Sequence, residues 1–138
     1  MDETEMNTED ISSKCILYVE DDPFILETTE AILRKLGYDV GIAINAEEAI
    51  KLFTSQSNRF DLVITDMNLP EMDGIELTKT LMAIDTAIPV ILCTGFGAQV
   101  DDQRLLDAGI RPTIGKPYSI GDLAEVINKV FSEGKGIN

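Results

Sequence analysis

The sequence of 138 residues contains no histidine and few basic residues. Without histidine the chain cannot form a Ser-His-Asp triad, a Cys-His dyad or a His-ligated zinc site, and it cannot carry a phosphohistidine. Only 11 Lys+Arg stand against 25 Asp+Glu, which gives a net charge of −14. Nucleic-acid surfaces need clustered Lys and Arg, so we expect no nucleic-acid partner.

Cysteine is scarce, and long apolar runs are missing. Cys15 and Cys93 are flanked by apolar residues and lie far apart in the sequence, so we expect two buried thiols in a reducing compartment rather than a disulfide. No stretch approaches the ~18 apolar residues of a membrane span. Residues 1–5 include three acidic residues and no basic one, whereas a signal peptide begins with basic residues. We therefore expect a cytoplasmic protein without a membrane partner.

The length fits a single domain, and 44% hydrophobic residues are enough for a core. Residues 1–13 hold five acidic residues and no basic one, so we expect an acidic flexible leader there. The folded domain is expected over residues 14–132, followed by a C-terminal tail over residues 133–138.

From Lys14 onward, short apolar runs typical of buried strands alternate with segments of helical apolar spacing. The expected strands are at residues 15–19, 38–43, 62–64, 89–93 and 112–114. The expected helices lie at residues 23–36, 45–53, 75–84, 100–108 and 122–131. This alternation predicts an α/β fold with a parallel sheet and helices on both faces. Gly37 is expected at the C-terminal cap of the first helix, and Asn45 at the N-cap of the second.

Ligands of such sheets bind beyond the carboxyl ends of the strands, and polar residues follow four of the expected strands there. Glu20 and Asp21 follow the first strand, Asp66 the third, Thr94 the fourth and Lys116 the fifth. A lone surface lysine or strand-end threonine is ordinary. Their occurrence in this order, after successive strands, favours one shared site.

The acidic side chains would repel one another in a single cleft, and a divalent cation relieves that repulsion. We expect Mg²⁺ (or Mn²⁺), with Asp21 and Asp66 as direct ligands, the backbone carbonyl of Asn68 as a third, and Glu20 acting through a water. Asp22 is expected to cap the following helix. Acidic turns near helix starts are also common without a metal, so this prediction depends on Asp66 lying close to the other two.

Asp66 ends an apolar run, which should direct its carboxylate into the cleft. An aspartate that attacks phosphorus forms an aspartyl phosphate. Lys116 and the hydroxyl of Thr94 could then hold phosphoryl oxygens, because phosphoryl transfer depends on positioning and on neutralising charge. Gly95 would leave the approach open.

The sequence resembles a receiver domain of the response regulators of two-component signalling. Four ordered motifs carry the resemblance: residues 16–22, 61–70 with 72–74, 89–95, and 116–117. It implies a single-domain flavodoxin-like (βα)5 fold with a five-stranded parallel sheet of order 2-1-3-4-5. It also implies roles for the site residues: Asp66 as phosphoacceptor, Glu20 and Asp21 as the acid pair, Thr94 as switch hydroxyl and Lys116 as the phosphoryl-binding lysine.

One position departs from the family pattern. Receivers usually carry Tyr or Phe three residues before the lysine, and this chain has Thr113, so the usual threonine–aromatic relay is in doubt. Asn68 and Phe96 are candidate modulators of the phosphoryl lifetime, and Phe96 is equally a candidate partner contact. Pro117 is a structural residue, and by the resemblance a cis bond before it would aim Lys116 into the cleft.

The expected function is a signalling switch, not an enzyme beyond its own phosphorylation and dephosphorylation. A histidine kinase or phosphotransfer protein would supply the phosphoryl group to Asp66 in a Mg²⁺-dependent phosphorelay. The downstream target is open, as is the choice between a stand-alone receiver and part of a larger regulator or hybrid sensor kinase. We expect a monomer or weak dimer.

Two other functions use related chemistry. A haloacid-dehalogenase-like phosphatase also combines an Asp nucleophile with Thr, Lys and magnesium, but there the acid pair follows the nucleophile, whereas here it precedes it. A flavodoxin would need a first loop that cradles a phosphate, and the acidic residues 20–22 would repel one.

Overall fold

The computed structural model describes residues 14–56, 59–94, 113–115 and 118–136 of the chain. Its strands are β1 (Cys15–Val19), β2 (Asp39–Ala43), β3 (Leu62–Asp66), β4 (Val90–Thr94) and β5 (Thr113–Gly115). Its helices are α2 (Pro23–Lys35), α3 (Ala46–Ser55), α4 (Gly74–Ile84) and α6 (Ile120–Gly136). The expected leader and the expected helix over residues 100–108 lie outside the described residues.

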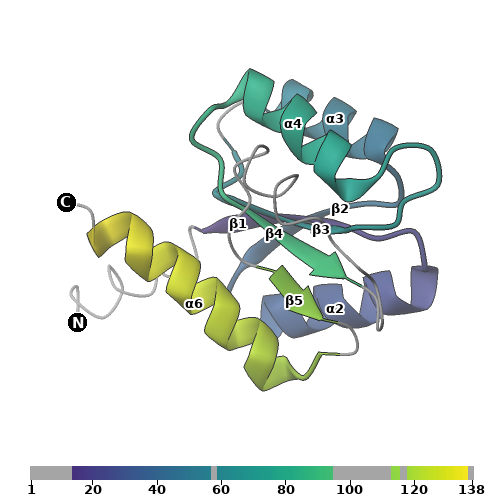
Figure 1. The fold of residues 1–138 in the computed structure, drawn as a ribbon. Coiled ribbons are helices and arrows are strands. Elements are labelled where there is room, and N and C mark those ends of the chain that lie inside the picture. Colours follow the sequence, from purple (N-terminus) through teal and green to yellow (C-terminus); the bar gives the residue numbers. More distant parts are fainter. Residues whose placement is uncertain (1–13, 57–58, 95–112, 116–117, 137–138) are drawn as a thin grey trace.

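All five strands pair in parallel in the order β2-β1-β3-β4-β5 (Figure 1), which confirms the flavodoxin-like fold. Helices α3 and α4 cover one face of the sheet, and α2 and α6 cover the other. No helix in the described part of the chain combines the length and apolar character needed to cross a membrane.

The core has two layers because successive strand residues point to opposite faces. Leu17 and Val63 pack with Phe53 of α3 on one face, while Ile64 packs with Leu33 of α2 on the other. The central strands are therefore buried on both sides, which explains their unbroken apolar runs.

The cysteines belong to opposite layers. Cys15 lies in the layer under α3 and α4, and Cys93 lies in the layer under α2 and α6. Both are buried and form no disulfide with each other, as predicted. Burial also raises the pKa of the Cys15 thiol, so this sulfur is a packing group rather than a nucleophile.

Helix α2 begins and ends as its sequence predicts. Its N-cap is Asp22, whose carboxylate accepts the N–H groups of Phe24 at 2.9 Å and Ile25 at 3.2 Å. At the other end Gly37 has φ 105°, a conformation that glycine adopts without strain. The Gly37 and Tyr38 N–H groups donate to the last carbonyls of the helix, which is a Schellman C-cap.

Other boundaries differ in detail from the expectation. Asn45 caps α3 as predicted, whereas the second strand begins at Asp39 rather than at residue 38. Ile84 ends α4 as expected but is 50% exposed. Helix α6 starts two residues before Asp122 and continues beyond residue 131 to Gly136.

Candidate functional site

Three carboxylates meet beyond the carboxyl ends of β1 and β3. The register pairs Val19 with Thr65, so Glu20 and Asp66 are the next residues on neighbouring strands. Ligand oxygens of Glu20, Asp21 and Asp66 all lie within 4.8 Å of one another. Glu20 and Asp66 are 1% and 5% exposed, and Asp21 is exposed. The structure thus brings together the three acidic residues that the sequence placed in one site.

Backbone hydrogen bonds fix the loops that carry these acids. The Glu20 N–H donates to the carbonyl of Ala43 at 3.0 Å, and the Glu20 carboxylate accepts the N–H of Asp22 at 3.1 Å. Beyond β3, the Met67 N–H donates to the carbonyl of Cys93 at 2.8 Å. The acidic residues therefore sit on backbone that is held from both neighbouring strands.

Gly74 lets α4 begin directly against the end of β3. A Cβ there would lie 2.5 Å from the backbone oxygen of Asp66 and 2.7 Å from Cδ1 of Leu92. The Gly74 N–H also donates to the carbonyl of Met67 at 2.8 Å. Gly74 belongs to a Pro- and Gly-containing stretch typical of a turn, and its contact with Asp66 is not predicted from the sequence. A signal for it is its place right after the helix cap Asp73, where glycine has no conformational advantage.

The donor set suits a hard divalent cation. Three negative charges within 4.8 Å repel strongly where two of them are buried, because the low dielectric strengthens their interaction. Carboxylate oxygens are the ligands that Mg²⁺ and Mn²⁺ prefer, and Mg²⁺ keeps several waters. The exposed Asp21 leaves room for those waters. Glu20, Asp21 and Asp66 therefore fit a magnesium site.

The remaining predicted residues are placed only in part. Thr94 is the half-buried last residue of β4, and because Asp66 pairs with Cys93 it stands one residue beyond Asp66 on the adjacent strand. Asn68 is exposed, two residues after Asp66. Thr113 is the exposed first residue of β5. Three predicted residues lie outside the described residues: Phe96, Lys116 and Pro117.

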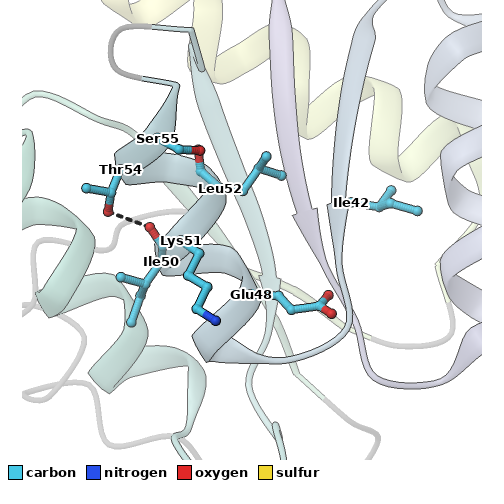
Figure 2. A pocket seen from close by; sticks show the side chains of 7 residues that line it. All are labelled: Ile42, Glu48, Ile50, Lys51, Leu52, Thr54 and Ser55. Carbon is cyan, nitrogen blue, oxygen red and sulfur yellow. Dashed lines mark hydrogen bonds between the residues drawn. The ribbon is translucent and has the colours of Figure 1, made fainter.

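An open, mostly apolar hollow lies elsewhere, along α3 and the end of β2 (Figure 2). Its lining residues are Ile42, Glu48, Ile50, Lys51, Leu52, Thr54 and Ser55. It shares none of them with the acidic cluster, so the candidate site is the cluster at the strand ends and not this hollow.

Comparison with known proteins agrees with this geometry. The family model of the response regulator receiver domain matches residues 16–128. The chain belongs to the response regulator receiver family. Receiver domains are signalling domains rather than classical enzymes, and the cluster of Glu20, Asp21 and Asp66 is compatible with the Mg²⁺-binding acidic pocket of such domains. Membership of this family argues against the phosphatase and the flavodoxin alternatives.

Curated relatives of this receiver include short and long proteins. The chemotaxis protein CheY of Thermotoga maritima is 34% identical over 118 residues, which cover 85% of this chain and 97% of that protein. The transcriptional regulatory protein PrrA of Mycobacterium bovis is 31% identical over 82% of this chain, but the match spans only 48% of PrrA. The receiver thus corresponds to the whole of one relative and to about half of another.

Solved structures share the fold. A CheY-like receiver domain protein of Methanospirillum hungatei has a TM-score of 0.83 and 33% identity over 92% of this chain and 100% of its own. The response regulator TrrA of Thermotoga maritima, solved in complex with Mg²⁺-BeF, has a TM-score of 0.75 and 31% identity, covering 84% of this chain and 97% of that chain.

Proposed function

We propose that this receiver is a phosphorylation switch whose phosphoacceptor is Asp66. The observation that carries the proposal is the buried Asp66 carboxylate beside Glu20 and Asp21, with ligand oxygens within 4.8 Å of one another. Because the chain has no histidine, the phosphoryl group comes from the phosphohistidine of a histidine kinase or phosphotransfer protein, or from a small phosphodonor. The downstream partner is a protein, and the relay operates in the cytoplasm.

The transfer step needs little beyond positioning and charge neutralisation. A carboxylate oxygen of Asp66 attacks phosphorus, and the new O–P bond forms as the P–N bond to the donor imidazole breaks. The electron pair of the broken bond stays on the imidazole nitrogen. The Thr94 hydroxyl and the Lys116 ammonium donate hydrogen bonds to the phosphoryl oxygens. Asn68 and Phe96 are the candidate modulators of how fast water removes the group.

Glu20, Asp21, Asp66 and the backbone carbonyl of Asn68 are the groups that would hold Mg²⁺ or Mn²⁺. A bound divalent ion supplies positive charge for the phosphoryl oxygens. That the relative TrrA was solved with Mg²⁺-BeF supports a magnesium site in this receiver. The exposure of Asp21 also supports a magnesium site, since the ion and its waters can enter without opening the core.

Labelling with acetyl phosphate tests the proposed function. With Mg²⁺ present, intact-mass spectrometry should detect one added phosphoryl group, and a chelator should suppress most of it. A protein that takes up no group, or takes it up equally well without the metal, would contradict the proposal. Repeated turnover of a phosphomonoester such as p-nitrophenyl phosphate would favour a phosphatase instead.

The metal site can be tested separately by replacing Asp21 with asparagine. The variant keeps the side-chain shape and removes one ligand charge, so Mg²⁺ should bind at least about tenfold more weakly, since even groups that only support metal ligands cost 10–100-fold. Calorimetric titration at physiological ionic strength measures this, because salt screens distant charges.

The matched control is Asp22→Asn at the next position. Asp22 caps α2 through its side-chain oxygen and is not one of the three clustered acids. Asparagine caps a helix as well as aspartate does, so this variant should keep its stability and nearly all of its Mg²⁺ affinity. Equal losses in the two variants would mean that net charge, not coordination, governs binding.

A further inference from the structure

Three hydroxyl groups meet on the face of the sheet that α2 and α6 cover. Oη of Tyr18, in β1, lies 2.8 Å from Oη of Tyr118. Oη of Tyr118 lies 3.4 Å from Oγ1 of Thr29, in α2. Tyr18 and Thr29 are 1% and 3% exposed, and Tyr118 is half-buried. One hydrogen-bonded cluster thus joins β1, α2 and the segment that leads into α6.

The Tyr18 hydroxyl has no packing role that a phenylalanine could not fill. Its layer is otherwise built from apolar side chains such as Ile16, Ile64 and Leu26, and placing a hydroxyl there is costly unless it is hydrogen-bonded. Burial, and next the neighbouring Tyr118, raise the pKa of Tyr18. The hydroxyl therefore stays neutral, and the bond persists across the physiological pH range.

The cluster links two segments that are close in the sequence to residues of the proposed site. Tyr18 precedes Glu20 by two residues on β1, and Tyr118 follows Lys116 by two residues, so the bond links positions 100 residues apart. The backbone directly after Tyr118 is also fixed. The Ser119 hydroxyl accepts the N–H of Asp122 at 3.0 Å, and the Asp122 carboxylate accepts the N–H of Ser119 at 3.3 Å, a reciprocal cap at the start of α6.

We propose that Tyr118 is a positioning residue of the phosphoryl-transfer site, whose bond to Tyr18 holds the segment next to Lys116 at a set place relative to β1. The proposal rests on the proposed function, in which Lys116 binds the phosphoryl group on Asp66. A charged donor accelerates transfer only when it is held in place beforehand, and a misplacement of about 1 Å costs up to ~10²-fold in rate. The hydrogen bond between Tyr18 and Tyr118 fixes the segment next to Lys116 in this way, relative to β1.

Tyr118→Phe keeps the ring and removes the bond. With acetyl phosphate and saturating Mg²⁺, the rate of phosphoryl uptake should fall by about 5- to 10-fold, a fraction of the loss expected for full misplacement. Mg²⁺ affinity should not change, because the three clustered acids are Glu20, Asp21 and Asp66 and neither tyrosine supplies a ligand. In a Lys116→Ala background the same substitution should cause no further loss, since coupled residues are non-additive.

The double variant Tyr18→Phe/Tyr118→Phe separates positioning from stability. Removing both hydroxyls leaves no tyrosine hydroxyl without its partner, although Thr29 loses its 3.4 Å contact, so the urea midpoint should return part of the way toward the wild-type value. The uptake rate should stay as low as in Tyr118→Phe. A rate that recovers along with stability, or a Tyr118→Phe rate equal to wild type, would overturn the proposal. A wild-type protein that is not labelled on Asp66 would overturn the proposed function itself.

Discussion

An Asp66→Asn variant should take up no phosphoryl group from acetyl phosphate and Mg²⁺, while the wild-type receiver takes up one. The amide that replaces the carboxylate has no negatively charged oxygen to attack phosphorus, and carboxylate attack is the only route to the aspartyl phosphate. Asn is nearly isosteric with Asp, so the buried position, 5% exposed, should be filled as before. Intact-mass spectrometry after a fixed incubation gives the comparison directly.

The matched control for this substitution is Asp73→Asn. Asp73 is the N-cap of α4, where its carboxylate accepts the N–H of Glu76 at 2.9 Å, and asparagine can make the same bond. This variant should be labelled at close to the wild-type rate. Labelling that persists in Asp66→Asn would remove Asp66 from its role and direct the search to another carboxylate.

The Asp66→Asn variant, which should lose phosphoryl uptake, should nevertheless gain stability. Three carboxylates lie within 4.8 Å of one another, and removing one charge from that group relieves repulsion. In the absence of Mg²⁺, Asp66→Asn should therefore unfold at a higher urea concentration than the wild type. With Mg²⁺ added the difference should shrink, because an ion that binds only the folded wild type stabilises it by mass action.

The features that the sequence predicts correctly are those whose causes are local. The apolar runs of β1 and β3 predict strands buried on both faces, and the structure has them. Asp22 and Asn45 predict helix starts, because their side chains can accept hydrogen bonds from the first N–H groups of a helix, and both do so. The acidic cluster follows from two facts that the sequence also carries. An acid stands at the end of each of the two strands, and the strand order that the family resemblance implies makes these parallel strands neighbours.

The features that it misses depend on distant partners. Nothing near Tyr18 indicates that its hydroxyl meets Tyr118, 100 residues away. The apolar spacing predicts a last helix over residues 122–131, yet α6 continues to Gly136. The sequence around Gly74 predicts only a turn, because the requirement for glycine comes from the close approach of α4 to β3.

The site therefore depends on packing outside the reacting residues. Asp66 is the last residue of β3, which sets its direction. Hydrogen bonds of Met67 with Cys93 and Gly74 hold the backbone that follows it, and the close approach at Gly74 sets the position of α4 against β3. A side chain at position 74 would disturb the proposed phosphoacceptor through its backbone oxygen, without touching its carboxylate. This makes the glycine a sensitive probe of how the fold supports the chemistry.

Gly74→Ala should destabilise the receiver by roughly 3 kcal/mol, at the upper end of what overpacking usually costs. The added Cβ would lie 2.5 Å from the Asp66 backbone oxygen, 2.7 Å from Cδ1 of Leu92 and 3.0 Å from Cα of Met67. Two of those atoms are backbone, so the helix start must shift rather than a flexible side chain. Urea denaturation measures the loss, and the rate of phosphoryl uptake should fall with it because Asp66 moves.

Gly121→Ala in α6 is the matched control. The nearest atom to its added Cβ is Oγ of Ser119 at 3.8 Å, an ordinary contact, and alanine favours a helix over glycine by up to about 1 kcal/mol. This variant should therefore be slightly more stable than the wild type and phosphorylated normally. If Gly74→Ala matched it in both measurements, α4 could move away from β3 without cost. The close approach at Gly74 would then not be what holds Asp66 in position.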